Sequence, residues 1–311
     1  MTDTRGGGER NEVRVRVPAT SANLGPGFDA LGLALELFEE LRLARRSAGV
    51  SQHQIRVSGV SAGRLQETPN LLAFRAAAAV YQRLGRTMPP LELELVTRIP
   101  SSRGFGSSAA AIVGGVVAAN TLEGTPLNRQ AQLELVTELE GHPDNVAAAL
   151  LGGFVVSVQG RSGLVAKRLE PPEELGAVVC IPEKAMSTKH ARGVMPTHLT
   201  RDDAVFNLGR TALLVAAFLT RDWALLRDAM DDRIHQPARG QIFPALHPAI
   251  EAALEAGAHG AALSGAGSGI IAFATGKEQE IAGAMRRTVE GHGFPCRTDV
   301  LRLSPRGAAV D

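Results

Sequence analysis

The chain is short of aromatic residues: its 311 residues include one tryptophan, one tyrosine and ten phenylalanines. Binding of single-stranded nucleic acid relies on aromatic side chains on which bases stack, so this composition argues against such a role. Charge of one sign is also missing, because 33 Lys and Arg face 32 Asp and Glu and the formal net charge is +1. Such a chain has no electrostatic attraction for nucleic acid or an anionic membrane. We therefore expect neither as a partner.

Cysteine is equally scarce, and both cysteines, Cys180 and Cys296, lie in apolar runs typical of strands. Two buried free thiols suit a reducing compartment. The first eleven residues, MTDTRGGGERN, lack the apolar core of a signal peptide, and we expect no apolar run long enough to cross a bilayer. These features predict a cytoplasmic protein with a disordered tail at residues 1–11.

What the sequence does contain is an alternation of strand-like and helix-like segments, which predicts an α+β protein. Apolar and charged residues alternate with period two at 13–17 and 91–96, which predicts strands. The Ala-rich segment 70–85 has helical spacing and ends on Gly85, a suitable C-cap. The polar, proline-bearing segment 161–176 predicts a domain boundary. The other predicted elements are strands at 152–160, 177–182, 261–265, 269–275 and 297–303, and helices at 109–122, 203–230, 247–257 and 277–293.

The most informative segment is the loop PSSRGFGSSAA, residues 100–110, between a strand and a helix. Gly104 and Gly106 allow the backbone to turn tightly and to approach a ligand closely. Ser107 and Ser108 bring hydroxyl groups to the helix N-terminus, where free N–H groups and the helix dipole favour an anion. Loops of this composition also occur without a ligand, but the natural guest here is a phosphate group.

Two widespread phosphate loops fit this segment poorly. The stretch 104–109, GFGSSA, matches the dinucleotide pattern G-x-G-x-x-A, yet no second strand with an acidic end follows, because the helix continues into 123–130. The P-loop pattern fails as well, since Gly276 and Lys277 precede Glu278 rather than Ser or Thr. The sequence therefore predicts a phosphate loop of a third kind.

Two further blocks accompany this loop: TSANLGPGFD at 20–29 and AALSGAGSGIIAFAT at 261–275. The order of the three blocks resembles the GHMP kinase superfamily. Within it, TSANLGPGFD and EGHPDN at 140–145 resemble the homoserine kinase family, and the resemblance covers roughly residues 12–303.

The chain departs from the family pattern at two points. Phe105 stands where the family usually has Leu, which is a change that the site can accommodate by size. The third block reads GAGSGII where GAGPT is common. This second change puts the shape of the loop behind the phosphate site in doubt, but it keeps Gly265 and Gly267, which we expect to form a third glycine loop.

The resemblance implies a two-domain GHMP kinase fold. Residues 12–165 would form an N-terminal, ATP-binding β/α domain like ribosomal protein S5, and residues 166–311 a C-terminal ferredoxin-like α+β domain. The implied reaction is ATP-dependent phosphorylation of the side-chain hydroxyl of L-homoserine, a step in threonine biosynthesis. The implied cofactors are ATP and Mg²⁺, the partner is a small molecule, and a homodimer is compatible with the family. A kinase for another small alcohol, such as mevalonate or a sugar, and a non-catalytic binder on the same fold remain alternatives.

The resemblance assigns the ATP phosphates to the whole loop and leaves the adenine contacts open, with Asn70 as one candidate. The loop residues expected at ATP are Pro100, Ser101, Ser102, Arg103, Gly104, Phe105, Gly106, Ser107, Ser108, Ala109 and Ala110.

A second group of candidates lies in ELEGHPDN, where carboxylates and an imidazole crowd the end of a helix. Mg²⁺ prefers hard oxygen ligands. The resemblance assigns it to the glutamate before the His-x-Asp-Asn run, Glu140, with Ser108 as its partner. Glu138 stays open as an alternative, because the alignment can slide by two residues.

The same segment supplies the candidates for catalysis. The resemblance directs His142 and Asn145 toward the substrate amino acid and its reacting hydroxyl. Asp144 is the nearest candidate for a general base, a role that homoserine kinases rely on less than some relatives do.

Recognition of an amino acid requires groups for both of its charged ends. Asn23 and Asp29 flank the turn in the first glycine-rich block, where they either cap the turn or, by the resemblance, contact homoserine. Arginine binds a carboxylate through two parallel hydrogen bonds. The family pattern points to Arg192 and Arg239 for the α-carboxylate, with Thr188 beside them.

Overall fold

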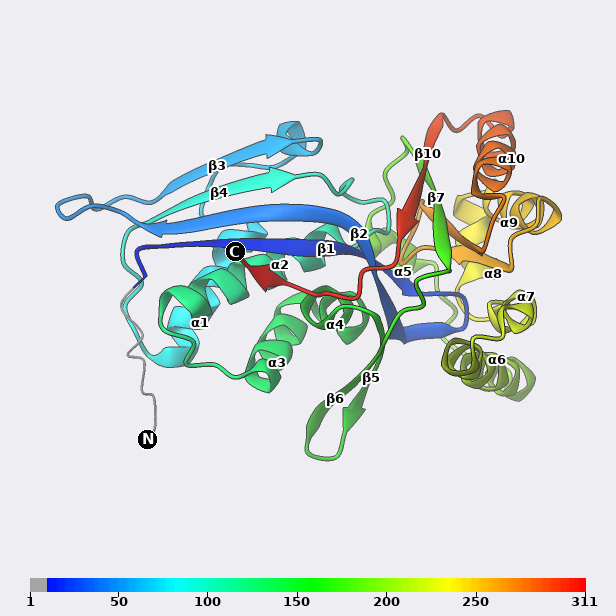
Figure 1. Cartoon of the computed structure of the whole chain (residues 1–311), viewed down its shortest axis with the longest axis horizontal. Coiled ribbons are helices and arrows are strands. Elements are labelled where there is room, and N and C mark those ends of the chain that lie inside the picture. The colour runs from blue at the N-terminus through cyan, green and yellow to red at the C-terminus, as the bar shows by residue number, and fades with distance from the viewer. Residues whose placement is uncertain (1–9) are drawn as a thin grey trace.

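Figure 1 shows a computed structural model of the chain, which describes residues 10–311. The predicted tail, residues 1–11, falls almost entirely outside the described residues. Two sheets organise the structure, one of seven strands and one of four. Helices α1–α4 cover one face of the larger sheet, and α8–α10 lie beside the smaller one (Figure 1). The predicted α+β class is confirmed.

The larger sheet has the strand order β11-β1-β2-β4-β3, and β5 pairs with both β2 and β6. Every neighbouring pair is antiparallel except β3 and β4, which are parallel. The long hairpin of β1 and β2 carries the predicted turn at 20–29 at its closed end. The strands are β1 (Glu12–Asn23), β2 (Gly27–Arg45), β3 (Gln54–Gly59), β4 (Leu91–Thr97), β5 (Phe154–Gly160), β6 (Gly163–Leu169) and β11 (Ala309–Val310).

The helices against this sheet are α1 (Leu72–Leu84), α2 (Ser107–Leu122), α3 (Arg129–Glu140) and α4 (Pro143–Leu151), with a short 3-10 helix, η1 (Ala62–Arg64). Helix α2 is apolar around almost its whole circumference, as expected for a helix buried on all sides. It packs between α1 and the sheet, so the phosphate loop that precedes it is held by the core.

The smaller sheet is antiparallel, with the order β10-β7-β9-β8. Its first and third strands in chain order are neighbours at the centre, which is the ferredoxin-like arrangement predicted for this half. Its strands are β7 (Gly176–Pro182), β8 (Gly260–Leu263), β9 (Ile270–Ala274) and β10 (Cys296–Arg302). The helices of this half are α5 (Thr188–Gly193), α6 (Arg201–Thr220), α7 (Leu226–Ala229), α8 (Gln236–Ile242), α9 (Leu246–Glu255) and α10 (Glu278–Gly291), with η2 (Trp223–Leu225) before α7.

The passage between the two halves differs in detail from the expected linker at 161–176. Its first part forms β6, which stays paired with β5 as far as Leu169. The chain then crosses to β7 through residues 170–175. After β10 it returns to the larger sheet, where Val310 pairs with Val15. The position of a boundary at residue 165 stays a prediction, and residues 309–310 complete the larger sheet.

Helix α6 qualifies one sequence-based expectation. Among residues 10–311 it is the one helix long and apolar enough, by length and composition, for a membrane span. The expectation that no segment reaches this length was therefore wrong for α6. A single such helix is weak evidence for a membrane span. In the structure, 22% of its apolar window is buried.

Candidate active site

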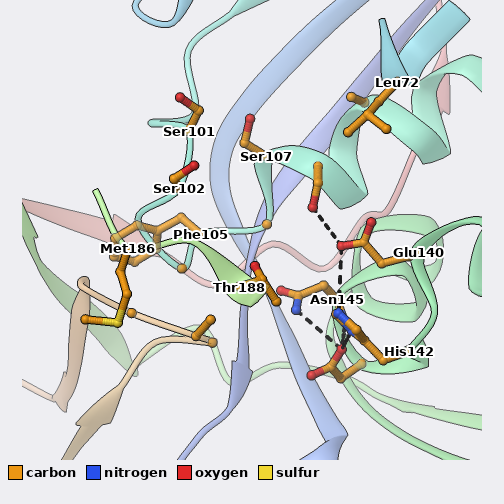
Figure 2. Close-up of a pocket in the computed structure, with 18 of the residues that line it drawn as sticks. Leu72, Ser101, Ser102, Phe105, Ser107, Glu140, His142, Asn145, Met186 and Thr188 are labelled. Atoms are coloured by element: carbon orange, nitrogen blue, oxygen red, sulfur yellow. Dashed lines mark hydrogen bonds and ion pairs between the residues drawn. The ribbon is translucent and has the colours of Figure 1, made fainter. Parts of the chain in front are cut away.

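A cavity of about 250 Å³ lies where the turn at 20–29, the phosphate loop, the α3–α4 junction, α5, α8 and the β8–β9 loop meet. In Figure 2, Ser101, Ser102 and Phe105 face Glu140, His142 and Asn145 across it. The predicted site residues that line the cavity are Asn23, Asp29, Ser101, Ser102, Gly104, Phe105, Gly106, Ser107, Ser108, Glu140, His142, Asp144, Asn145, Thr188, Arg192, Arg239, Gly265 and Gly267. Those that do not line it are Pro100, Arg103, Ala109 and Ala110, and Asn70 is exposed outside it.

Two positions in the phosphate loop require glycine, because the backbone has a positive φ there and a Cβ atom would collide with a neighbouring group. Gly104 has a φ of +81°, and a Cβ there would lie 1.9 Å from the carbonyl oxygen of Ser264. Gly106 has a φ of +69°, and its Cβ would lie 1.9 Å from the Thr20 hydroxyl. The Ser264 hydroxyl also donates to the Gly104 carbonyl at 2.7 Å. The loop therefore fits tightly between β1 and the third glycine loop.

Arg103 connects this loop to the smaller sheet rather than to the cavity. Its buried guanidinium donates to the carbonyls of Pro182 and Ser101, each at 2.8 Å, and to that of Glu183. Burial lowers the pKa of Arg103. Because its donors serve three carbonyls, the side chain fastens the loop to the end of β7.

The structure separates the two candidate metal ligands, Glu140 and Glu138. The Ser108 hydroxyl donates to Glu140 at 2.7 Å, inside the cavity. Glu138 lies outside it, with 68% of its side chain exposed and an ion pair to Arg83. Burial raises the pKa of Glu140, and this effect outweighs the hydrogen bond from Ser108 and the nearby His142 and Arg192, which act in the opposite direction. A hydroxyl oxygen and a carboxylate oxygen side by side in the cavity are ligands that suit Mg²⁺.

Beside Glu140, a chain of hydrogen bonds fixes the start of α4. His142 Nδ1 lies 2.7 Å from Asp144 Oδ1, which also accepts from the backbone N–H of Asn145 at 2.8 Å. The Thr20 hydroxyl donates to Asn145 Oδ1 at 2.8 Å. Burial alone would lower the pKa of His142, but the hydrogen bond to Asp144 and the nearby carboxylates raise it. His142 and Asn145 thus point into the cavity in fixed orientations. Thr20 is the first residue of the block TSANLGPGFD, but sequence reasoning gave it no role, because its contact with Asn145 joins segments 125 residues apart.

The charged end of the cavity is formed by residues far apart in the chain. Arg192 binds Asp29 through two hydrogen bonds of 2.9 and 2.6 Å, and this bond raises the pKa of Arg192. Arg239 lies beside them and donates to the Gly265 carbonyl at 2.9 Å. Asn23 donates to the same carbonyl at 2.9 Å and accepts from the backbone N–H of Asp29, so its amide joins the turn to the third glycine loop.

Arg239 is oriented by His235, which sequence reasoning missed. His235 is fully buried, and its Nε2 lies 2.7 Å from the Gly25 carbonyl while Nδ1 lies 3.1 Å from Arg239 Nη1. Burial lowers the pKa of His235 to about 4, so the ring is neutral, with Nε2–H donating and Nδ1 accepting. Burial also lowers the pKa of Arg239, to about 10, which leaves it protonated at neutral pH.

The opposite end of the cavity is apolar and contains one buried acid, Glu39 on β2. The apolar residues of this end, which we call the apolar arm, are Leu65, Leu71, Leu72, Leu95 and Ala111. Glu39 is 2% exposed and accepts a hydrogen bond of 3.1 Å from the Ser107 hydroxyl. Burial raises its pKa to about 8. Sequence reasoning missed Glu39 because it sits beside Glu40, and the pattern does not show which of the two faces inward.

Glu39 is expected to make the stability of the protein depend on pH. Its pKa is raised on folding, so its contribution to stability is present below the unfolded value of about 4.5 and is lost as the pH rises through about 8. Between these two pH values the free energy of unfolding should fall by at most about 1.4 kcal/mol per pH unit because of Glu39. The Glu39→Gln variant, which has no carboxyl group at this position, should lack this contribution. Urea unfolding at pH 5, 6.5 and 8 measures it; parallel pH profiles for wild type and variant would contradict the assignment.

Gly106→Ala is expected to weaken ATP binding by about tenfold or more, which is the effect expected from a single steric clash at the binding site. The new methyl group would collide with the Thr20 hydroxyl and disturb its bond to Asn145. Gly85→Ala is a matched control, because Gly85 has a similar φ of +63° but open space around its Cβ. Calorimetric ATP titrations should show the loss for Gly106→Ala alone. Equal affinity in both variants would contradict the close packing of this loop.

Comparison with known proteins agrees with this geometry. The family model of the GHMP kinases N terminal domain matches residues 71–153, and that of the GHMP kinases C terminal domain matches residues 214–291. The chain belongs to the GHMP kinase family. The protein is therefore a kinase, an enzyme that uses ATP as co-substrate and a small molecule as phosphate acceptor.

Its relatives point to one branch of this family. The homoserine kinase of Moorella thermoacetica is 44% identical over 296 residues, which cover 95% of this chain and 99% of that protein. That of Symbiobacterium thermophilum is 46% identical over 307 residues, covering 96% and 94%. The crystal structure of homoserine kinase from Cytophaga hutchinsonii superposes with a TM-score of 0.88 at 31% identity, covering 99% of this chain and 100% of that one.

Proposed function

We propose that this enzyme transfers the γ-phosphate of ATP to the side-chain hydroxyl of L-homoserine, yielding O-phospho-L-homoserine for threonine biosynthesis. The observation that carries the proposal is a single cavity with a phosphate loop at its centre and the group Asp29, Arg192 and Arg239 at one end. The names of the most similar relatives support the same substrate. We also propose that the enzyme works in the cytoplasm.

The charged end of the cavity complements a free amino acid. Arg192 and Asp29 neutralise each other in the structure, and a zwitterion offers a carboxylate for the arginine and an ammonium for the aspartate. Arg239 supplies a second guanidinium for the carboxylate, and Thr188 lies on the same wall of the cavity. Held at both ends, homoserine would direct its hydroxyl toward the phosphate loop.

Phosphoryl transfer depends mainly on position and on charge neutralisation. We assign Ser108 and Glu140 to Mg²⁺, which when bound supplies positive charge to the phosphate oxygens. The backbone of Gly104–Ser108 and the N-terminus of α2 hold the phosphates. Asn145, fixed by Thr20, faces the reacting hydroxyl, and Asp144 positions His142 and Asn145 through its hydrogen bonds.

The alternative substrates differ in the groups that they offer to this end of the cavity. Mevalonate has a carboxylate but no ammonium, and a neutral sugar has neither, so neither of them offers Asp29 a cationic group. Solved structures of mevalonate kinases share the fold at low identity, for example 18% for that of L. major, and this shows the fold alone.

A substrate panel tests the proposal. ADP release should be measured with ATP, Mg²⁺ and L-homoserine, D-homoserine, L-serine, mevalonate or galactose as acceptor. We expect kcat/KM for L-homoserine to exceed that for mevalonate or galactose by at least about tenfold, as expected from one additional charge-assisted contact. D-homoserine and L-serine carry the same charges but place the hydroxyl elsewhere, so they should also be poorer acceptors. Preference for mevalonate or galactose would overturn the substrate assignment.

A further inference from the structure

The apolar arm of the cavity borders one polar group with an incomplete set of hydrogen bonds, the carboxyl group of Glu39. Its Oε1 accepts from the Ser107 hydroxyl, while Oε2 is buried and has no hydrogen-bond partner among residues 10–311. An unsatisfied buried polar atom costs free energy. Because Glu39 lines the cavity, a bound ligand can supply the hydrogen-bond partner that Oε2 lacks.

The position of Glu39 relates it to the nucleoside rather than to the phosphates. Ser107 and Ala111 lie one helical turn apart on α2, so Glu39 sits beneath the first turn of that helix. Across the sheet, Leu41 pairs with Leu95, which places Glu39 diagonally beside Leu95 of the apolar arm. Since the phosphates belong to the loop and homoserine to the charged end, the apolar arm is the space left for ribose and base.

The charge state of Glu39 determines which hydrogen bond it can make. No Lys, Arg or His among the described residues pairs with it, and the only polar contact is the Ser107 hydroxyl. An unpaired buried carboxylate takes up a proton rather than stay ionised. With Oε1 occupied as an acceptor, a proton on Oε2 has no acceptor among the described residues and is available to a ligand.

We propose that Glu39 is a nucleoside-binding residue, whose protonated carboxyl group donates a hydrogen bond from Oε2 to a ribose hydroxyl or to a ring nitrogen of the base of ATP. The inference rests on the proposed function only in taking ATP as the nucleotide. It concerns nucleotide affinity and does not depend on which alcohol is phosphorylated.

Direct titration calorimetry on the 311-residue chain tests the proposal without a second substrate. Glu39→Leu removes the donor and keeps similar bulk, Glu39→Gln keeps a donor and an acceptor, and Glu40→Gln is a control on the outer face of the same strand, where Glu40 pairs with Arg98. Each variant is titrated with ATP and with inorganic tripolyphosphate, which has no nucleoside. Circular dichroism and thermal unfolding confirm that each is folded.

We expect Glu39→Leu to bind ATP about three- to tenfold more weakly and tripolyphosphate with wild-type affinity. Glu39→Gln should stay within about threefold of wild type for both ligands, and Glu40→Gln should match wild type. Undiminished ATP affinity in Glu39→Leu would overturn the proposal. An equal loss for ATP and tripolyphosphate would also overturn it, because Glu39 would then act through Ser107 on the phosphate loop.

Nucleotide analogues identify the acceptor. The set is 2′-deoxy-ATP and 3′-deoxy-ATP for the ribose, and the 1-, 3- and 7-deaza analogues for the base nitrogens. With one of them, wild type and Glu39→Leu should bind equally, because the partner atom is already absent. If the difference between the two proteins persists with every analogue, Glu39 makes no hydrogen bond to a ribose hydroxyl or to a ring nitrogen of the base, and the proposal is overturned. Failure to phosphorylate homoserine would refute the proposed function but would leave these binding results intact.

Discussion

Replacing Glu140 by glutamine is expected to lower kcat at least about 100-fold while the protein stays folded. Glutamine keeps the size of the side chain and can still accept from the Ser108 hydroxyl, but an amide oxygen is a poorer Mg²⁺ ligand than a carboxylate. Steady-state kinetics at saturating ATP and homoserine, over a range of Mg²⁺ concentrations, measures the effect. Added Mg²⁺ should restore part of the activity.

The matched control for this experiment is Glu138→Gln. Glu138 lies on the same helix, two residues earlier, but its side chain is exposed and pairs with Arg83 outside the cavity. We expect its kinetics to be those of wild type. The reverse pattern, an inactive Glu138→Gln and an active Glu140→Gln, would show that the metal assignment is displaced by two residues.

The second large effect is expected from Arg192→Met, which should reduce kcat/KM for homoserine roughly 30- to 1000-fold. Methionine keeps the bulk of the stem but removes the guanidinium, so the substrate carboxylate loses one charged partner and Asp29 loses its ion pair. Calorimetric ATP affinity should stay within about twofold of wild type, because the phosphate loop is untouched.

Two comparisons sharpen the test of Arg192. Lys189→Met removes a cation from the exposed side of the same helix, α5, and should have no effect. With 3-aminopropan-1-ol, which lacks the carboxylate, wild type and Arg192→Met should differ little. Arg239 is a less selective probe, since its removal would also leave the buried His235 without its partner and lower the stability of the fold. Wild-type turnover of homoserine by Arg192→Met would exclude the assignment of Arg192 to the carboxylate of an amino-acid substrate.

Most of the fold could be predicted where local pattern and tertiary role coincide. The alternation at 91–96 is that of β4, which buries every second residue, and Gly85 adopts the left-handed conformation expected of a helix C-cap. The hairpin strand β6 was missed because it pairs only with β5 and exposes even Val165, so it carries too little apolar signal. Strand β11 has two residues and depends entirely on β1 for its partner.

The site was predictable as far as sequence motifs extend along the chain. Blocks such as PSSRGFGSSAA carry the phosphate loop because local backbone geometry demands those glycines. Contacts between distant segments carry no such signal. The Thr20–Asn145 bond arises when α4 packs against β1, and the Asp29–Arg192 pair and the His235 ring between Gly25 and Arg239 arise when the two halves of the chain assemble. Glu39 was hidden for a further reason: a buried unpaired acid contradicts the usual preference for apolar residues at inward positions.

A crystal structure with a non-hydrolysable ATP analogue, Mg²⁺ and L-homoserine bound tests the central claim most directly. We predict the β- and γ-phosphates against Gly104–Ser108, the metal at Ser108 and Glu140, and the homoserine carboxylate at Arg192 and Arg239. The homoserine hydroxyl should lie near Asn145, about 3–3.5 Å from the γ-phosphorus and in line with the leaving oxygen. Nucleotide and homoserine in separate cavities, or homoserine with its carboxylate turned toward the phosphate loop, would contradict the account.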